Sequence, residues 1–488
     1  MEYYTTLLLL LAILITTIQC SKILFGKSKL PPGPKPWPII GNILKLGDNP
    51  HLAVAELVKI YGPIMSLKLG SKTTIVISSP EVAKEMFLNH DLALSSKFVP
   101  EAEKAENHDK FSMIWLPSAS PKRTNLRKIA TIQLFTSRQL NMSQDIRQKK
   151  VKELVEYVQQ CSEKGLPVNI GKAAFTTSLN LLSNTLFSVD LASHVSSNTQ
   201  EFKDLIWSIL EECGRANLSD LFPLLKKLDL QGALKRTSGY FKKLLGIFEE
   251  IIVERLKDPT DVKDDVLGTL LKLVKDQEMS VDDIRHMLVD LFIAGTDTTS
   301  NALEWAMTEL LRNPEIMKKA QIELDQVLGK DGSILQESDI TNLPYIDAIM
   351  KETMRLHPVG PFLVPRKAEE KVLLCGYWIP KDSIIWVNIW SIGRDPSVWP
   401  NPNMFSPERF IERNIDIKGQ DFKLIPFGSG RRMCPAMPLA NRMVHLMLAT
   451  LIHSFNWNAA SPKAIDIEEK FGLTLQKVEP LQAIPLPK

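Results

Sequence analysis

The chain has 488 residues, of which 44% are hydrophobic and 24% are charged, and its formal net charge is +3. A chain of this length and composition can bury a large core, and so small a net charge gives no basis for nucleic-acid binding. Its cysteines are odd in number and scattered, which argues against a disulfide framework and indicates a reducing compartment.

The amino end is apolar. The run Thr5–Phe25 spans about 20 residues, which is near the length that crosses a bilayer. A cleaved signal peptide is the alternative, but the start carries Glu2 and no Lys or Arg, and no small-x-small cleavage site follows. Because lysines follow the apolar run, the positive-inside rule places the rest of the chain in the cytosol. We therefore predict a retained membrane anchor at residues 1–25.

Residues 26–45 are rich in proline, most densely from Pro31 to Pro38. Prolines lack an amide donor and fix the backbone, so a helix cannot continue through them. We predict a stiff hinge or linker at residues 26–45, followed by a single domain at residues 46–488.

Two strands and then mostly helices are predicted after this hinge. Ile64–Leu69 alternates apolar and polar residues, and Thr73–Ser78 is rich in β-branched residues. Residues 97–120 have the composition of a loop, and residues 213–224 interrupt a helical pattern. Amphipathic helices are expected at residues 145–160, 200–215 and 240–257.

The segment 122–128 is strongly basic and opens a further helical stretch. Charge runs of this kind usually form a solvated helix face. The alternative is a docking surface for an acidic protein, because opposite charges steer association.

A long helix is predicted over Val281–Arg312, with Ser280 and Asp283 as a capping box and Asn313-Pro314 as the stop. In its middle stands Ala294-Gly295-Thr296-Asp297-Thr298-Thr299, where glycine and hydroxyl residues weaken a helix. Either a separate helix begins at this point, or one helix continues through a weakened, kinked groove.

Glu352 and Arg355 stand three residues apart on a predicted helix, which most often makes a minor surface salt bridge. The stretch from His357 to Arg366 is proline-rich and apolar, so its backbone is expected to be extended. A packing or hydrogen-bonding role is expected for His357, rather than metal ligation.

The segment Phe427–Ala436 holds Cys434 just before a predicted helix, in a loop with two glycines. The helix N-terminus and the adjacent Arg431 and Arg432 favour a thiolate. No second cysteine accompanies Cys434, so a zinc site is not expected, whereas one thiolate beside arginines suits haem iron with its two propionates. A buried structural cysteine is the alternative.

This loop resembles the haem-ligand loop of the cytochromes P450, the haem-thiolate monooxygenases, whose pattern is Phe-Gly-x-Gly-x-Arg-x-Cys-x-Gly. The last glycine of the pattern is Ala436 here. Ala294–Thr299 resembles the family's Ala/Gly-Gly-x-Asp/Glu-Thr-Thr signature, and Glu352-x-x-Arg355 and Pro407–Phe410 follow in the family's order. The resemblance covers about residues 30–480.

The resemblance implies a mainly α fold with a small β region, in which a single domain carrying haem b follows an N-terminal membrane anchor. A thiolate-bound iron accepts two electrons and O2, and one oxygen atom enters an unactivated C–H bond. Cys434 would bind the iron, and Asp297 and Thr298 would pass protons to the bound oxygen.

The resemblance also assigns contacts to the haem and to a substrate. The propionate partners would be Arg127, Arg366 and Arg432, and the other haem contacts would be Phe427, Gly428 and Ala294. The family's Trp-x-x-x-Arg pattern has Arg123 in place of its tryptophan here. The expected pocket for a small hydrophobic substrate is lined by Phe111, Asn217, Asp290, Val359, Phe362, Leu363 and Leu473. Glu352, Arg355 and Arg409 would form a buried structural network.

Several segments, among them Cys-Pro-x-Met-Pro-Leu-Ala, are most similar to the plant members that oxidise terpenoids, although an apolar pocket agrees equally with steroids, phenolics or fatty acids. The anchor and hinge resemble those of members in the endoplasmic-reticulum membrane, which take electrons from NADPH–cytochrome P450 reductase. With the haem domain in the cytosol, the sequons at Asn141 and Asn217 should stay unglycosylated.

Two other functions are alternatives to monooxygenation. A relative that rearranges peroxides without activating O2 lacks the acid–alcohol pair, so Asp297 and Thr298 count against it. A non-catalytic haem-binding or sensor protein is the second, and the departures at Arg123 and Ala436 are of the kind that such a protein shows.

Overall fold

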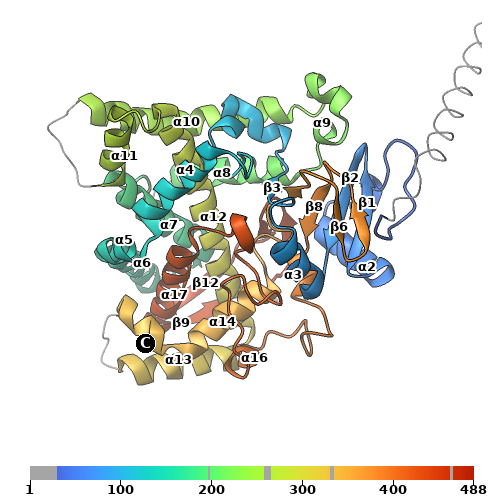
Figure 1. The fold of residues 1–488 in the computed structure, drawn as a ribbon. Helices are drawn as coiled ribbons and strands as arrows, with labels where there is room; N and C mark the ends of the chain where they lie inside the picture. The colour runs from blue at the N-terminus through green and yellow to red at the C-terminus, as the bar shows by residue number, and fades with distance from the viewer. Residues whose placement is uncertain (1–29, 196–197, 258–264, 330–334, 462–464) are drawn as a thin grey trace, which may run out of the picture.

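A computed structural model describes residues 30–195, 198–257, 265–329, 335–461 and 465–488. Helices make most of the molecule, a strand-rich region lies at one side, and the long helix α12 crosses the middle (Figure 1). The predicted mainly α fold with a small β region is therefore confirmed. The predicted anchor lies outside the described residues, and within those ranges no helix combines the length and apolarity that a membrane crossing needs.

The larger sheet has five strands in the order β1-β2-β8-β5-β3. The predicted hairpin is present as β1 (Ile64–Leu69) and β2 (Lys72–Ile77), and β2 runs parallel to β8 (Ile384–Val387). β5 (Arg366–Lys367) joins β8 to β3 (Ser96–Lys97), so that Arg366 and Lys97 are direct partners across two strands. This pairing brings two basic residues together at one end of the sheet.

The remaining strands form three small antiparallel sheets. They are β4 (Val168–Asn169), β12 (Gln482–Pro487) and β9 (Phe455–Ala459), then β10 (Glu469–Phe471) and β11 (Leu475–Lys477), then β6 (Val372–Leu374) and β7 (Tyr377–Ile379).

Part of the predicted proline hinge is packed against the large sheet. The backbone N–H of Ser66 donates to the carbonyl of Pro32 at 2.8 Å, and the Ser66 hydroxyl donates to the carbonyl of Pro31 at 2.7 Å. A Cβ atom on Gly33 would lie 1.9 Å from the Ser66 carbonyl oxygen. The close approach needs glycine, and the chain from Pro31 onward is thus fixed to β1 rather than free-standing.

The long helix α12 has the predicted bounds, Val281–Arg312, and its capping box is present. The Ser280 hydroxyl accepts from the N–H of Asp283 at 3.1 Å, and the Asp283 carboxylate accepts from the N–H of Ser280 at 2.9 Å. The helix is unbroken through residues 294–299, so the alternative of a separate second helix is wrong. Its threonine hydroxyls donate to carbonyls one turn earlier, which satisfies them inside the helix.

The predicted amphipathic helices are present and longer than expected, as α6, α8 and α10. The predicted loop at 97–120 contains β3 and the 3₁₀ segment η2, because its short turns carry no periodic signal. The α-helices besides α12 are α2 (Pro50–Tyr61), α3 (Pro80–Asn89), α4 (Pro121–Ala130), α5 (Ser137–Met142), α6 (Gln144–Glu163), α7 (Ile170–Phe187), α8 (Asn198–Gly214), α9 (Leu218–Leu221), α10 (Ala233–Lys257), α11 (Val266–Lys275), α13 (Pro314–Leu328), α14 (Pro344–Leu356), α15 (Ile389–Ile392), α16 (Glu408–Ile411) and α17 (Met437–Ser454). The 3₁₀ segments are η1 (Ile43–Lys45), η2 (Glu101–Lys110), η4 (Pro223–Leu228), η5 (Glu337–Asn342) and η6 (Gly430–Arg432), and η3 (Thr131–Phe135) is a π-helical segment.

Helix α12 belongs to two separate hydrophobic cores. Its first half packs with α7, α8, α10 and α11, and its last half packs with α6, α13, α14 and α17. Residues 294–301 belong to neither of these two clusters in the described structure. The weakened stretch of the helix therefore lies where the two cores part.

Candidate functional site

The loop that carries Cys434 closes on itself. Gly428 and Gly430 have φ of 71° and 67°, a left-handed backbone that favours glycine. The N–H of Cys434 donates to the carbonyl of Phe427 at 3.0 Å, which fixes the cysteine directly before α17. Phe427 itself packs against a core cluster that includes Phe410.

The Cys434 thiol lies where a thiolate is only partly supported. Burial raises the pKa of the Cys434 thiol, whereas the backbone N–H groups of Ala436 and Met437 and the charge of Arg127 oppose that rise. A metal ion on the sulfur would supply the missing positive charge. A single cysteine thiolate is a protein ligand that haem iron accepts.

Two interior surfaces near this loop are left uncovered. Residues 432–442 are all half-buried, although the rest of α17 is mostly buried. In the middle of α12, which is mostly buried, Ala294 is exposed and Thr298, one turn later, is half-buried. Helices α12 and α17 contact each other, and Ala436 and Ile293 both pack against one core cluster. We call Ala294 and Thr298 the open strip of α12. The open strip and the half-buried residues 432–442 therefore belong to neighbouring helices.

Basic side chains from four segments converge on the cysteine loop. Arg127 of α4 donates to the Met433 carbonyl at 2.6 Å, and Arg366 of β5 donates to the Ser429 carbonyl at 3.1 Å. Arg432 donates to carbonyls and a hydroxyl of Ser95, Met113, Ile114, Leu116 and Ser118. We call Lys97, Arg123, Arg127, Arg366 and Arg432 the basic cluster.

The basic cluster has too few negative partners. Asp91 pairs with Arg366 at 3.0 Å, but in the described part of the chain no carboxylate forms an ion pair with Arg123, Arg127 or Arg432. Burial and repulsion by the neighbouring arginines lower the pKa of Arg432 to about 9. Such an excess of positive charge fits a dianion, and the two propionates of haem meet that requirement.

Lys97 is a member of the cluster that sequence reasoning missed. Burial and the charges of Arg366 and Arg432 hold the pKa of its ammonium group well below its usual range. Its place depends on the pairing of β3 with β5, two-residue strands far apart in the chain, and no local signal predicts that pairing.

Asp297 and Thr298 adjoin in sequence but point to different neighbours. The Thr298 hydroxyl donates to the Ala294 carbonyl at 2.6 Å on the open strip. The Asp297 carboxylate is 1% exposed and accepts from Thr474 at 2.8 Å and from Gln476 at 2.6 Å. Burial raises the pKa of Asp297, and these two hydrogen bonds oppose the rise. To exchange a proton on the open strip, Asp297 must leave these donors.

Of the predicted pocket residues, Leu363 lies beside the cysteine loop, and the backbones of Val359 and Leu473 bond to β11 and α8. Leu363 approaches Gly428 in the cysteine loop, with a Leu363 methyl 3.8 Å from the position of a Cβ there. The Val359 carbonyl accepts from the N–H of Leu475 at 2.7 Å, and the N–H of Leu473 donates to the Leu210 carbonyl at 3.0 Å. These bonds join the proline-rich stretch to β11 and the turn before β11 to α8.

The structure gives other contacts to the remaining predicted pocket residues. Phe362 is buried and stacks on Trp386 with ring centroids 4.6 Å apart. Asn217 is 4% exposed and caps α9 by accepting from the N–H of Ser219 at 2.9 Å. Phe111 stacks on His286 with ring centroids 4.9 Å apart. These side chains are used in packing, for which aromatic and capping residues are as well suited as for ligand contact.

Asp290 binds the segment that connects α12 to the cysteine loop. Its carboxylate accepts from the Ser112 hydroxyl at 2.6 Å, the Met113 N–H at 2.8 Å and His108 Nε2 at 3.2 Å. Because Arg432 donates to the carbonyls of Met113 and Ile114, the segment 112–116 is fastened to α12 on one side and to the cysteine loop on the other. His108 and Met113 carry no motif that could have revealed this role.

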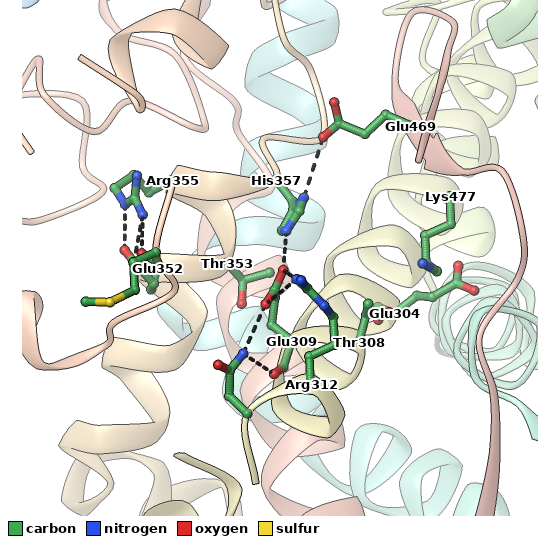
Figure 2. Close-up of polar contacts among 12 residues, drawn as sticks. Glu304, Thr308, Glu309, Arg312, Glu352, Thr353, Arg355, His357, Glu469 and Lys477 are labelled. Atoms are coloured by element: carbon green, nitrogen blue, oxygen red, sulfur yellow. Dashed lines mark hydrogen bonds and ion pairs between the residues drawn. The ribbon is translucent and has the colours of Figure 1, made fainter. Parts of the chain in front are cut away.

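The structure brings Glu352, Arg355 and Arg409 together in the interior. The Glu352 carboxylate accepts from Arg355 Nε at 2.6 Å, from Arg409 Nε at 3.0 Å and from the Ser406 N–H at 2.8 Å. Glu352 is 0% and Arg355 1% exposed, so the alternative of a surface salt bridge is wrong. Arg355 also donates to the carbonyl of Gly393, and Figure 2 shows its guanidinium facing Glu352.

A second polar group beside this network contains His357. Its Nε2 lies 2.8 Å from Glu309 and its Nδ1 3.5 Å from Glu469, as Figure 2 shows. Its ring stacks on Trp305 with centroids 4.0 Å apart. Glu469 also meets His51 Nε2 at 2.9 Å. The expected packing and hydrogen-bonding role of His357 is confirmed.

Comparison with known proteins covers almost the whole chain. The family model described as Cytochrome P450 matches residues 31–483. Cytochrome P450 76AD1 of Beta vulgaris is 54% identical in an alignment 496 residues long that covers 99% of each chain. Cytochrome P450 monooxygenase 76AD131 of Lophophora williamsii is 53% identical over the full length of both chains. Geraniol 8-hydroxylase of Catharanthus roseus is 50% identical over 99% of each chain.

Proposed function

Because the chain belongs to the cytochrome P450 family, whose members are haem-thiolate monooxygenases, we propose that it hydroxylates or otherwise oxidises a small terpenoid, using O2 and electrons from NADPH. The observation that supports the site most strongly is the uncovered strip of α12 beside the cysteine loop and its basic cluster. Two relatives named geraniol 8-hydroxylase, 50% and 49% identical, support the substrate class.

Haem b supplies the redox and oxygen chemistry when it is bound. Cys434 would hold the iron, and Arg127, Arg366 and Arg432 would turn from backbone carbonyls to the propionates. A charged hydrogen bond to a carboxylate is stronger than one to a carbonyl, which favours that exchange. Gly428, Phe427 and Ala294 would border the macrocycle, the last from the α12 side.

Thr298 would donate a proton at its hydroxyl, the polar side-chain group on the open strip one turn from Ala294. Asp297 would restore that proton after turning away from Thr474 and Gln476, and its raised pKa makes it a better proton donor near neutral pH. Segment 112–116 would exclude water above the substrate, because Asp290 and Arg432 fasten it at both edges.

A small hydrophobic substrate and a redox partner are general features of the family. We propose NADPH–cytochrome P450 reductase as the partner and the endoplasmic-reticulum membrane as the location, with a single-pass anchor at residues 1–25 and the haem domain in the cytosol. The apolar run Thr5–Phe25 and the lysines that follow it support this orientation.

The test is co-expression of the full chain with a plant reductase in microsomes. The reduced protein with carbon monoxide should show the red-shifted band of thiolate-bound haem, and geraniol should give an NADPH- and O2-dependent product one oxygen atom heavier. The band without any terpenoid product, but with oxidation of a phenolic of similar size, would overturn the substrate class. Peroxide rearrangement without NADPH, or no turnover at all, would favour the two other functions.

A further inference from the structure

We propose that Arg123 is a further haem-propionate ligand, which adds a full positive charge where the family pattern has the neutral indole of tryptophan. The inference rests on the haem binding proposed above. It concerns a position at which this chain departs from the family pattern.

The fold directs Arg123 to the cysteine loop. Helix α4 begins at Pro121 behind the Ser120 cap, so Arg123 and Arg127 lie one turn apart on the same face. Arg123 Nη2 donates to the Arg431 carbonyl at 3.2 Å, and Arg127 Nη2 donates to the Met433 carbonyl at 2.6 Å. The two guanidinium groups therefore reach the same loop two residues apart, directly before Cys434.

Arg123 is buried but poorly satisfied. It is 5% exposed, and its Nε is a buried donor without a hydrogen-bond partner in the described structure. Asp91, the carboxylate that pairs with Arg366 of the basic cluster, also accepts from the N–H of Arg431. A buried charged donor without a partner costs free energy, so an acceptor is expected at this place when the site is filled.

A propionate provides that acceptor. The planar fork of a guanidinium matches a carboxylate with two parallel hydrogen bonds, whereas an indole can donate only one and carries no charge. A positive charge beside the haem favours the form with one more electron. Arg123 should therefore tighten haem retention and raise the reduction potential.

The experiment uses the full-length holoprotein with the variants Arg123→Met, Arg123→Trp and Arg123→Lys. Lys128→Gln is the matched control, because it removes one charge from an exposed position of the same helix. The measurements are the haem reduction potential by spectroelectrochemistry and the rate of haem transfer to apomyoglobin. The carbon monoxide spectrum of each variant reports separately whether thiolate ligation, and so the proposed function, stands.

Arg123→Met should lower the potential and speed haem loss about tenfold, as expected for one charge-assisted hydrogen bond. Arg123→Trp should recover retention but keep the lower potential, and Arg123→Lys should keep the potential near that of the parent. If Arg123→Met does not fold, the difference between the Lys and Trp variants carries the same test. Potentials and loss rates equal to those of Lys128→Gln, in protein with normal thiolate ligation, would overturn the proposal.

Discussion

Glu352 is the side chain whose replacement we expect to destabilise the protein strongly without touching the haem. The substitution Glu352→Gln keeps the volume of the side chain but removes its charge. It leaves Arg355 and Arg409, which are 1% and 8% exposed, without their shared carboxylate. It also sets an amide NH2 group against a guanidinium or against the N–H of Ser406, which both donate.

Removal of one partner from a buried ion pair typically costs about 3–5 kcal/mol. Arg355 and Arg409 each keep hydrogen bonds to backbone carbonyls, among them those of Gly393 and Pro400, so part of their charge stays solvated by the protein. We therefore expect the free energy of unfolding to fall by about 3 kcal/mol, the lower end of that range.

The matched control is Glu56→Gln. Glu56 meets Lys59 at 2.6 Å, but their side chains are 71% and 69% exposed, so this pair should contribute at most about 1 kcal/mol. Both variants are compared in equilibrium urea unfolding, followed by tryptophan fluorescence and by the haem band. A midpoint for Glu352→Gln that moves no further than that for Glu56→Gln would refute the claim that this network is structurally important.

Thr298→Ala should leave haem binding intact but uncouple NADPH consumption from product and raise peroxide release; unchanged coupling would remove Thr298 from proton delivery. Burial and the charge of His108 lower the pKa of His286 from its ordinary value of 6.5 to about 4. Between pH 6.5 and about pH 4, the unfolded chain therefore binds more protons than the folded chain, and the free energy of unfolding should fall as the pH falls through that window. His286→Gln should make this fall shallower in urea titrations, and an equal slope would contradict the assignment. Asn141 is exposed, so its sequon can report orientation: no glycosidase-sensitive mass is expected in microsomes, and a glycan would reverse the proposed topology.

Local signals predicted the elements that depend on local chemistry. The bounds of α12 followed from the Ser280 capping box and the Asn313-Pro314 stop, which act within a few residues of the helix ends. The hairpin at Ile64–Leu69 followed from alternation of its side chains, and its second strand was placed one residue late. In the same way, the glycines before Cys434 required the left-handed backbone that the loop has.

Features that depend on tertiary contacts could not be predicted. The direction of Asp297 is set by Thr474 and Gln476, about 180 residues later in the chain, and the spacing of α12 alone does not reveal it. The sequence predicts that Asp290 borders a ligand, but in the fold its carboxylate meets Ser112 and His108, which come from a distant part of the chain.

The contact between His51 and Glu469 joins residues 418 positions apart. Since the ribosome releases the chain from its amino end, α2 is made long before the strand that completes its polar contacts. A polypeptide that ends before β10 lacks Glu469, so His51 and His357 would both lose the carboxylate that they share. The contacts of Glu469 with His51 and His357 can therefore form only after β10 has been made.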